Sequence, residues 1–312
     1  MNWGLLGGAL IAGFVIALIS VSLSIQLANR FDILDYPDSD RKVQIRPIPK
    51  LGGLAVGIAF TLTTGIALIV LDIPGELQLA SSAIIPAVFA GFVGYLDDRR
   101  HLNPYLRLVF QGVTGVLVWW LGSQVDVFGF TWLNAALVVI FVMALINGLN
   151  LLDNSDGLAG STVIVSALGA SVIAVISGQE LVSVLGFALV GVALGFLRYN
   201  WFPARVYLGD SGAYFLGTLL ASLLVGLRPT GVSPIVGVAL ALLLAALPIL
   251  DTTYVVARRL KVGIHPFTAG RDHLAHRLQD KGRTVAGSVL TLQAGLFVTT
   301  AVAIGLAAAQ VS

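Results

Sequence analysis

The feature that most constrains the fold is the recurrence of apolar runs, roughly 18 to 25 residues long, along the whole chain. A helix of that length matches the hydrocarbon core of a bilayer. Of the 312 residues, 57% are hydrophobic and 11% charged, and the mean hydropathy is +0.93. A soluble domain carries about 25% charged residues. The sequence therefore predicts an all-α, polytopic membrane protein that forms a single domain over residues 1–312.

The apolar runs divide the chain into about ten expected transmembrane helices. The first run has neither a basic segment before it nor a small-residue cleavage site, so we expect a retained helix rather than a signal peptide. The expected helices are 4–28, 52–72, 80–97, 104–122, 132–149, 160–177, 181–198, 212–227, 233–256 and 285–308.

The distribution of Lys and Arg tests this assignment of helices and loops, because cytoplasmic loops are enriched in these residues. The segments between the expected helices alternate between thin and strongly polar. All but one of the 18 Lys and Arg residues lie in or beside the polar segments, and the exception is Arg228. We therefore expect both termini outside and the polar segments in the cytoplasm. These segments are 29–51, 98–103, 150–159, 199–211 and 257–284.

Two adjacent carboxylates, Asp97 and Asp98, end the third expected helix in the segment GYLDDRR. Carboxylates at a membrane boundary suit a hard cation such as Mg²⁺, which prefers oxygen ligands. The alternative is a pair of interfacial acids that bind Arg99 and Arg100.

The segment NGLNLLDNSDGLAG places four small polar side chains between two apolar runs. Asn147, Asn150 and Asp153 would lie along one face if the helix continued through them, and Asp156 follows. Asparagine amides suit sugar hydroxyls and phosphate oxygens because they both donate and accept. The alternative is a capping and turn cluster, although a single cap needs fewer residues.

Asp210 stands in a GDSG turn directly before the eighth expected helix. Free backbone N–H groups and the helix dipole favour phosphate at such a position. A plain capping role for Asp210 is the alternative.

The last polar segment, HPFTAGRDHLAHRLQDKGR, combines histidines with basic residues. His273 and His276 would share a helical face, and Arg271 stands beside them. This combination suggests binding of a polyanion such as a diphosphate. A loop that attracts anionic lipid is the alternative, and a zinc site is disfavoured by the positive charge nearby.

Two further charged residues are ambiguous in the sequence. Lys50, at the start of the second helix, could hold a lipid phosphate or could simply set the topology. Asp251 lies inside the ninth expected helix, where we expect it to pair with Arg258 or Arg259.

Five segments in this order resemble the polyprenyl-phosphate N-acetylhexosamine-1-phosphate transferases. This family includes the phospho-N-acetylmuramoyl-pentapeptide translocases and the GlcNAc-1-phosphate transferases that initiate O-antigen and teichoic acid linkage units. The resemblance covers nearly the whole chain. The segments are DYPDSDRK…RPIPKLGG, GYLDD, NGLNLLDNSDGLAG, NWFPARVYLGDSG and RDHLAHRL.

The resemblance implies a ten-helix enzyme of a bacterial or archaeal plasma membrane, with a cleft that faces the cytoplasm. A polyprenyl phosphate would attack the β-phosphate of a UDP-N-acetylhexosamine and give polyprenyl-diphosphate-sugar and UMP. Mg²⁺ would be required, and Mn²⁺ could replace it. The expected partners are these two substrates, with no nucleic acid, and a homodimer is left open.

The resemblance also implies roles for individual residues. Asp97 and Asp98 would lie at the attacking phosphate, where one accepts its proton, and would bind the metal together with Asp210. The other implied residues bind substrate. They are Lys50, Asn147, Asn150, Asp153, Asp156, Arg271, His273 and His276.

The chain departs from the family pattern at Asn154, where many members have glycine, and at Ala275, where many have histidine. The sparser histidine motif favours a simple UDP-N-acetylhexosamine over the muramoyl-pentapeptide donor, which remains the alternative. An ion-coupled transporter would place acids near the bilayer midplane, whereas here they gather on one face.

Overall fold

The computed structural model describes residues 2–37, 46–71, 76–268 and 270–311. Within them the protein is almost wholly helical, and each expected span coincides with one helix or with a pair of helices. The helices are α1 (Trp3–Arg30), α2 (Gly52–Leu71), α3 (Glu76–Arg100), α4 (Pro104–Trp120), α5 (Thr131–Leu152), α6 (Leu158–Ile176), α7 (Glu180–Asn200), α8 (Gly209–Gly226), α9 (Pro234–Leu244), α10 (Ala246–Lys261), α11 (Leu274–Asp280) and α12 (Val285–Val311).

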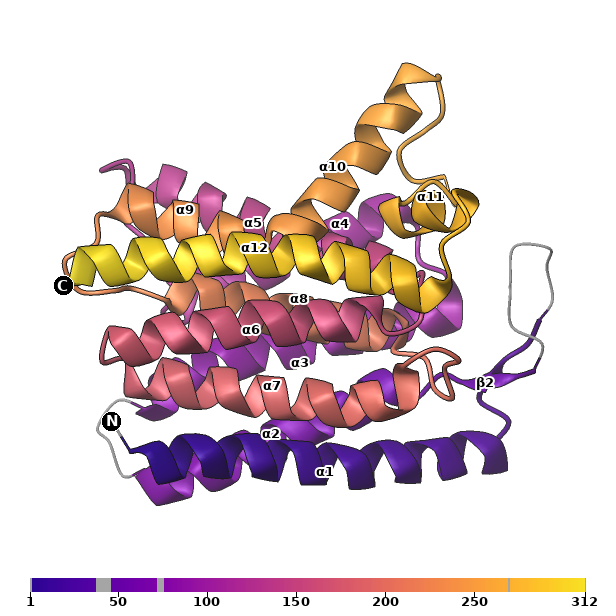
Figure 1. Ribbon diagram of the computed structural model, residues 1–312, viewed down its shortest axis with the longest axis horizontal. Helices are drawn as coiled ribbons and strands as arrows, with labels where there is room; N and C mark the ends of the chain where they lie inside the picture. The colour runs from indigo at the N-terminus through magenta and orange to yellow at the C-terminus, as the bar shows by residue number, and fades with distance from the viewer. Residues whose placement is uncertain (1, 38–45, 72–75, 269, 312) are drawn as a thin grey trace.

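A short antiparallel ribbon interrupts the helices after α1. It pairs β1 (Leu34–Asp35) with β2 (Ile48–Pro49), so that Leu34 lies opposite Pro49. The ribbon projects beyond one end of the bundle (Figure 1). The ribbon leads directly into α2, whose first residue, Gly52, donates its N–H to the Tyr207 carbonyl.

The long helices lie side by side, and α8 forms the centre of the bundle (Figure 1). Every residue of α8 from Ser211 to Val225 is buried. Glycines on its neighbours let the backbones approach closely, as is common between membrane helices. A Cβ at Gly94 of α3 would lie 2.3 Å from the Asp210 carbonyl oxygen, so this crossing fixes the end of α3 against the start of α8.

The ninth expected span, 233–256, is not one straight helix. α9 and α10 meet at Ala245 with a bend of 74°, and α10 leaves the bundle (Figure 1). The apolar pattern of the sequence continues through the bend, which is why periodicity alone does not reveal it. The break turns α10 away from the long helices, so it does not run alongside them (Figure 1).

Seven of the described helices are long and apolar enough to cross a bilayer, and the bent pair would be an eighth. α4, with 17 residues, and α8, with its polar first turn, complete the ten expected spans. Apolar side chains such as Ile11, Ile19 and Phe297 are exposed on the outside of the bundle, as lipid contact requires. The protein is therefore a multi-pass membrane protein, while the exact number of spans stays a prediction.

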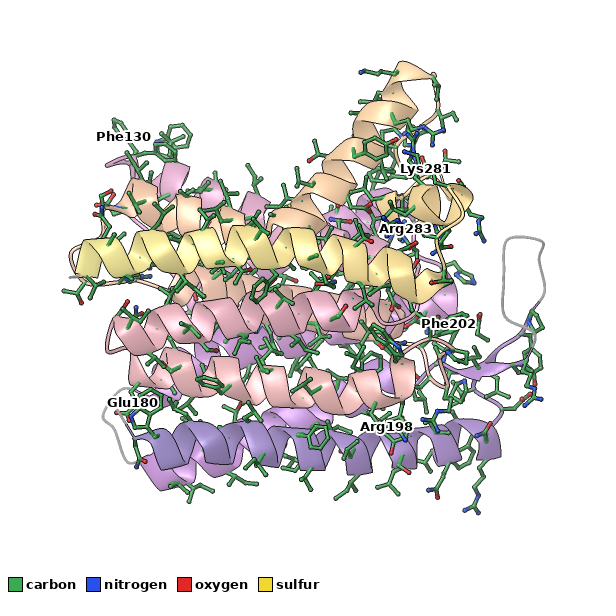
Figure 2. The ribbon with its side chains drawn as sticks, in the orientation of Figure 1. Phe130, Glu180, Arg198, Phe202, Lys281 and Arg283 are labelled. Atoms are coloured by element: carbon green, nitrogen blue, oxygen red, sulfur yellow. The ribbon has the colours of Figure 1, made fainter. Side chains whose placement is uncertain are left out.

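The two ends of the bundle carry different residues. Arg198, Phe202, Lys281 and Arg283 lie at one end, whereas Phe130 and Glu180 lie at the other (Figure 2). Both termini lie at the end of Phe130 and Glu180 (Figure 1). This arrangement agrees with the expected parity of the loops, and the cytoplasmic side stays a prediction.

Candidate active site

The first turn of α8 is the point where the predicted acidic motifs meet. Asp98, at the end of α3, accepts hydrogen bonds from the backbone N–H groups of Asp210 and Ser211, at 3.2 and 3.1 Å. A carboxylate at this position satisfies N–H groups that have no partner inside the helix and interacts favourably with its dipole. Asp98 therefore holds α3 and α8 together.

Asp153 binds the same turn from another direction. It caps the C-terminus of α5, and its Oδ2 accepts the Gly209 N–H at 3.2 Å. Gly209 has a φ of +69°, in the left-handed region that favours glycine. The Gly209 N–H can therefore bind Asp153, while the next two N–H groups, of Asp210 and Ser211, bind Asp98.

Asp210 itself lies in this turn, and its Oδ1 accepts a short hydrogen bond from Asn150 Nδ2. Asn150 is on the last turn of α5, three residues before Asp153, as the predicted shared face requires. α5 ends at Leu152, so Asp153 belongs to the cap rather than to a continuing helix.

The carboxylates are close enough to repel one another. The pKa of Asp153 is raised well above its usual value, first by burial and then by repulsion from Asp210, Asp98 and Asp156. A cluster of buried acids that repel one another favours the binding of a cation.

Lys50 supplies positive charge beside the cluster. It lies within electrostatic range of Asp98, and its Nζ forms an ion pair with Asp35 Oδ1 at 2.7 Å. The β1–β2 ribbon fixes this position, because Lys50 N also donates to the Ile33 carbonyl. Asp35 was missed in the sequence, since a lone acid in a loop carries no pattern.

Asp97 has a different environment from that of its neighbour Asp98. It is buried, and its Oδ1 accepts the Leu102 N–H, while its Oδ2 accepts Arg107 Nη1 at 3.2 Å and the Tyr214 hydroxyl at 2.9 Å. Arg107 and Tyr214 were not predicted. The spacing of four residues between Asp210 and Tyr214 on one helix could have suggested the latter.

The simpler interpretation, in which Asp97 and Asp98 pair with Arg99 and Arg100, does not hold for the described residues. Arg107 takes that place at Asp97, and the Arg99 guanidinium lies 5.4 Å from the Tyr95 ring centre.

Within the described residues, Asn147 makes no hydrogen bond to the aspartate cluster. Its side chain exchanges hydrogen bonds with Gln111 of α4, at 2.6 and 3.3 Å, and donates to the Met143 carbonyl. The shared-face prediction placed it with Asn150, but the amide pair joins α4 to α5 instead. A substrate-binding role for Asn147 would require this pair to open.

Asp156 lies in the loop after α5, where its Oδ2 accepts the Ala204 N–H at 2.9 Å. Burial raises its pKa. Asn200 accepts the neighbouring Gly157 N–H at 3.0 Å and donates to the Val206 carbonyl, so it ties this loop to the 201–208 segment. Tyr207 in that segment has a raised pKa, through burial and the nearby charge of Asp156.

The histidine segment forms a second group of side chains, held by α10. His273 caps α11, and its ring centre lies 5.9 Å from that of His276 in an edge-to-face arrangement. Burial, followed by the charge of Arg271, lowers the pKa of His276. The expected pairing of Asp251 with Arg258 or Arg259 is wrong: Asp251 binds His273, and Arg259 binds Asp272.

The two groups flank the same end of α5. A Cβ at Gly148 would lie 2.7 Å from Pro248, so α10 starts directly against α5 near Asn150. The ring of Phe267, in the histidine segment, lies 6.0 Å from that of Tyr105 at the start of α4. Across the described parts of the chain no recorded hydrogen bond or ion pair joins the histidines to the aspartate cluster.

The oxygen donors of the cluster have the chemistry that Mg²⁺ requires. Asp153 Oδ1 and Asp210 Oδ2 have no recorded hydrogen-bond partner within the described residues. No group of three or more acidic or histidine side chains there is close enough to form a complete metal cage. The set therefore fits a cation that is bound by one or two carboxylates and completed by other ligands, which is the usual arrangement for Mg²⁺.

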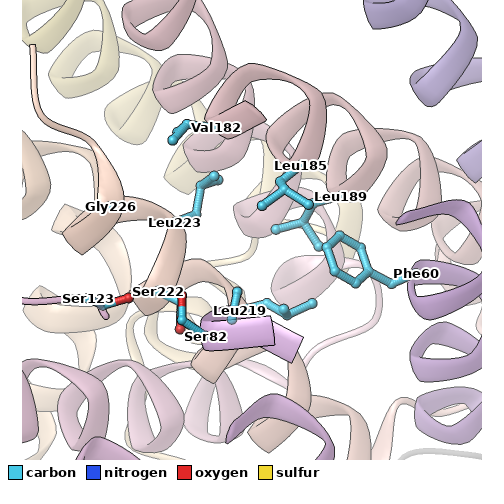
Figure 3. A pocket seen from close by; sticks show the side chains of 11 residues that line it. Phe60, Ser82, Ser123, Val182, Leu185, Leu189, Leu219, Ser222, Leu223 and Gly226 are labelled. Carbon is cyan, nitrogen blue, oxygen red and sulfur yellow. The ribbon is translucent and has the colours of Figure 1, made fainter. Parts of the chain in front are cut away.

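A small apolar cavity lies elsewhere, between α2, α3, α7 and the last turns of α8. Phe60, Leu189 and Leu223 line it together with Ser82 and Ser222 (Figure 3). It lies far along α8 from Asp210 and contains no ionisable side chain, so it is not a candidate for phosphate chemistry.

Comparison with known proteins places these features in a family. The signature described as glycosyl transferase family 4 matches residues 80–228, which include every residue of the aspartate cluster. Over these residues, just under half of the chain, the sequence is similar to glycosyl transferase family 4. The resemblance inferred from the five sequence segments is thereby confirmed.

Relatives in this family match most of the chain. The probable undecaprenyl-phosphate N-acetylglucosaminyl 1-phosphate transferase of Bacillus subtilis is 28% identical, over 97% of this chain and 86% of its own. The undecaprenyl-phosphate alpha-N-acetylglucosaminyl 1-phosphate transferase of Escherichia coli K12 is 27% identical, over 94% and 82%. A phospho-N-acetylmuramoyl-pentapeptide-transferase of Streptococcus equi is 29% identical, over 69% and 70%. The family match and these relatives identify the protein as an enzyme of the transferase class.

Proposed function

We propose that this protein transfers an N-acetylhexosamine-1-phosphate from its UDP-sugar to a membrane polyprenyl phosphate. The observation that carries the proposal is the convergence of Asp98, Asp153 and Asp210 on the first turn of α8, at one end of a bundle of membrane-length helices. A lipid phosphate can reach a site at that depth while its chain stays in the bilayer. The printed names of the Bacillus and Escherichia relatives support this reaction.

The bond changes define what the site must do. An oxygen of the lipid phosphate forms a bond to the β-phosphorus of the UDP-sugar, the bond from that phosphorus to the oxygen bridging the two phosphates breaks, and UMP leaves with that oxygen. Both reactants are anionic, so the site must offset their repulsion and align them. Lys50 and the histidine segment, with Arg271, supply positive charge on either side of the cluster.

Asp210 and Asp153 would hold Mg²⁺ through their unpartnered oxygens, with Asp98 beside them, and the bound cation would offset phosphate charge. Asp98 is the better candidate of the adjacent pair for accepting a proton from the lipid phosphate. Each of its oxygens accepts one N–H, whereas Asp97 Oδ2 already accepts two donors. Asp97 then acts by holding Arg107 and Tyr214.

The test is a transfer assay with the purified protein in detergent, Mg²⁺, undecaprenyl phosphate and radiolabelled UDP-GlcNAc. We expect a lipid-soluble product and an equal amount of UMP, and no product after chelation of divalent cations. Asp210→Asn should lower turnover at least about 100-fold, because it weakens the binding of the cation that would offset the phosphate charge, while the protein stays folded. Glu180→Gln, at the opposite end of the bundle, is the matched control.

Absence of transfer with a panel of UDP-sugars, including the muramoyl-pentapeptide donor, would refute the proposal. Use of the pentapeptide donor alone would place the protein with the Streptococcus relative. Full activity of Asp210→Asn would refute the assignment of the site.

A further inference from the structure

The inward face of α10 buries two charged side chains where an amphipathic helix normally buries apolar ones. The buried positions follow one another at intervals of four residues, at Asp251, Val255 and Arg259. Burying a charge is costly unless it is paired and hydrogen-bonded. Both charged residues meet this condition through the histidine segment.

Arg259 anchors the segment to α10. Its Nε and Nη2 donate to the two oxygens of Asp272 at 2.9 and 2.7 Å, and its Nη1 donates to the Pro266 carbonyl at 2.6 Å. A two-pronged contact of this kind fixes direction as well as distance. This contact places His273, the residue after Asp272, beside Asp251. On α10, Asp251 lies two helical turns before Arg259.

Asp251 binds both the side chain of His273 and the backbone that follows it. Its Oδ2 lies 2.8 Å from His273 Nδ1, and its Oδ1 accepts the Leu274 N–H at 2.8 Å. The side chains of Asp251 and His273 are only 1% and 5% exposed. Within the described residues, His276 Nδ1 is buried without a hydrogen-bond partner. His273 Nε2 also has no hydrogen-bond partner there, but it is not fully buried and keeps contact with solvent.

A carboxylate can only accept hydrogen bonds, so Nδ1 must carry a proton to bind Asp251. This leaves Nε2 as the ring nitrogen that can bind a ligand. Carboxylate–histidine pairs of this kind orient imidazoles in many catalytic and metal sites.

We propose that Asp251 is a positioning residue for the transfer reaction, which keeps the proton on His273 Nδ1 and presents Nε2 to the UDP-sugar. The inference rests on the proposed function and adds to it a residue that does not touch substrate. The plain alternative is that Asp251 only caps α11 through Leu274.

Asp251→Asn separates the two roles. The Leu274 N–H can only donate, so the amide oxygen of Asn must face it, as Oδ1 of Asp251 does now. The amide NH₂ then faces His273 Nδ1 and makes it an acceptor, which moves the ring proton to Nε2. The variant therefore keeps the cap and reverses the tautomer.

The first measurement is the ¹⁵N NMR spectrum of the protein labelled at its histidine rings. The chain has only 4 histidines, so His273→Gln assigns the signals of His273. We expect a protonated Nδ1 in the unchanged protein and an unprotonated Nδ1 in Asp251→Asn. An unprotonated Nδ1 in the unchanged protein would overturn the inference, whether or not the variant folds.

The second measurement is kinetic. We expect Asp251→Asn to lower kcat/KM for UDP-GlcNAc about 10- to 100-fold, the usual range for loss of a carboxylate that orients a histidine. The KM for polyprenyl phosphate and the thermal midpoint should stay unchanged. Asp280→Asn, an exposed acid in the same segment, is the matched control and should keep full activity.

A double variant decides whether Asp251 acts through the histidine. Adding Asp251→Asn to His273→Gln should change kcat/KM by no more than about twofold, because the imidazole that Asp251 orients is already absent. A further loss of the full size would show an independent structural role and overturn the inference. If the unchanged protein transfers no sugar, the proposed function fails, while the NMR result still decides the pairing.

Discussion

At the scale of single residues, the carboxylates of the site bind backbone N–H groups as well as facing one another. Asp98, Asp153 and Asp156 each accept at least one backbone N–H from a distant segment. These hydrogen bonds hold together carboxylates that would otherwise repel one another. Under the proposed function, stability and activity depend on the same side chains, and removal of a charge should affect them in opposite directions.

Asp156→Asn tests this opposition. Burial raises the pKa of Asp156 above 3.8, so the folded protein binds its proton more tightly than the unfolded chain does. Stability contributed by this group is therefore lost as the pH rises from 3.8 through the raised value. Asn has no charge to bury and can still accept the Ala204 N–H, so we expect the variant to melt at a higher temperature than the unchanged protein near neutral pH.

The measurement is thermal unfolding in detergent at about pH 4 and about pH 8, with the transfer assay alongside. The advantage of the variant should shrink toward the acidic end, while its activity falls. A variant that is less stable than the unchanged protein at about pH 8 would contradict the assignment.

At the scale of elements, the decisive contact is the crossing of α3 and α8. Hydrophobic periodicity predicted both helices to within a few residues, because each must cover its backbone polar groups in lipid. It could not predict that Gly94 meets the backbone of Asp210, since any small residue satisfies the pattern. The closeness of this crossing places Asp98 at hydrogen-bonding distance from the first turn of α8.

Gly94→Ala should separate these helices. The added Cβ would lie 2.3 Å from the Asp210 carbonyl oxygen, and overpacking of this kind costs about 1–3 kcal/mol. We expect a lower thermal midpoint and a loss of transfer activity, because Asp98 moves away from the first turn of α8.

Gly65→Ala on α2 is the matched control, since a Cβ there meets nothing within 4 Å. It should change stability by less than about 1 kcal/mol and leave activity intact. Equal behaviour of the two variants would show that the α3–α8 crossing does not position the site.

At the scale of the whole molecule, the orientation of the bundle can be measured directly, because the chain contains no cysteine. Phe130 and Phe202 are exposed, at 61% and 45%, and lie at opposite ends (Figure 2). The bias of Lys and Arg places the end of Phe202 in the cytoplasm. Phe202→Cys should therefore react with a membrane-impermeant maleimide in inside-out vesicles, and Phe130→Cys in right-side-out vesicles. The reverse pattern would overturn the proposed cytoplasmic site.

The sequence by itself determined the fold class and singled out three acids that the fold brings together, Asp98, Asp153 and Asp210. Lipid offers no partner for backbone polar groups, so length and apolarity alone specify membrane helices. A charged side chain in such a chain is expensive, so the sequence predicted a site at these acids without any knowledge of the packing.

Only the tertiary structure decided which of these residues act together. Asn147 leaves the cluster for Gln111, Asp97 turns to Arg107 and Tyr214, and Asp251 binds His273 rather than a neighbouring arginine. These partners are separated in the chain by a loop or by whole helices, and hydrophobic periodicity contains no information about such pairs. The packing of α4 against α3 and α5, and of α3 against α8, selects the partners of Asn147 and Asp97, because a hydrogen bond forms only when the backbones carry both groups to within about 3 Å.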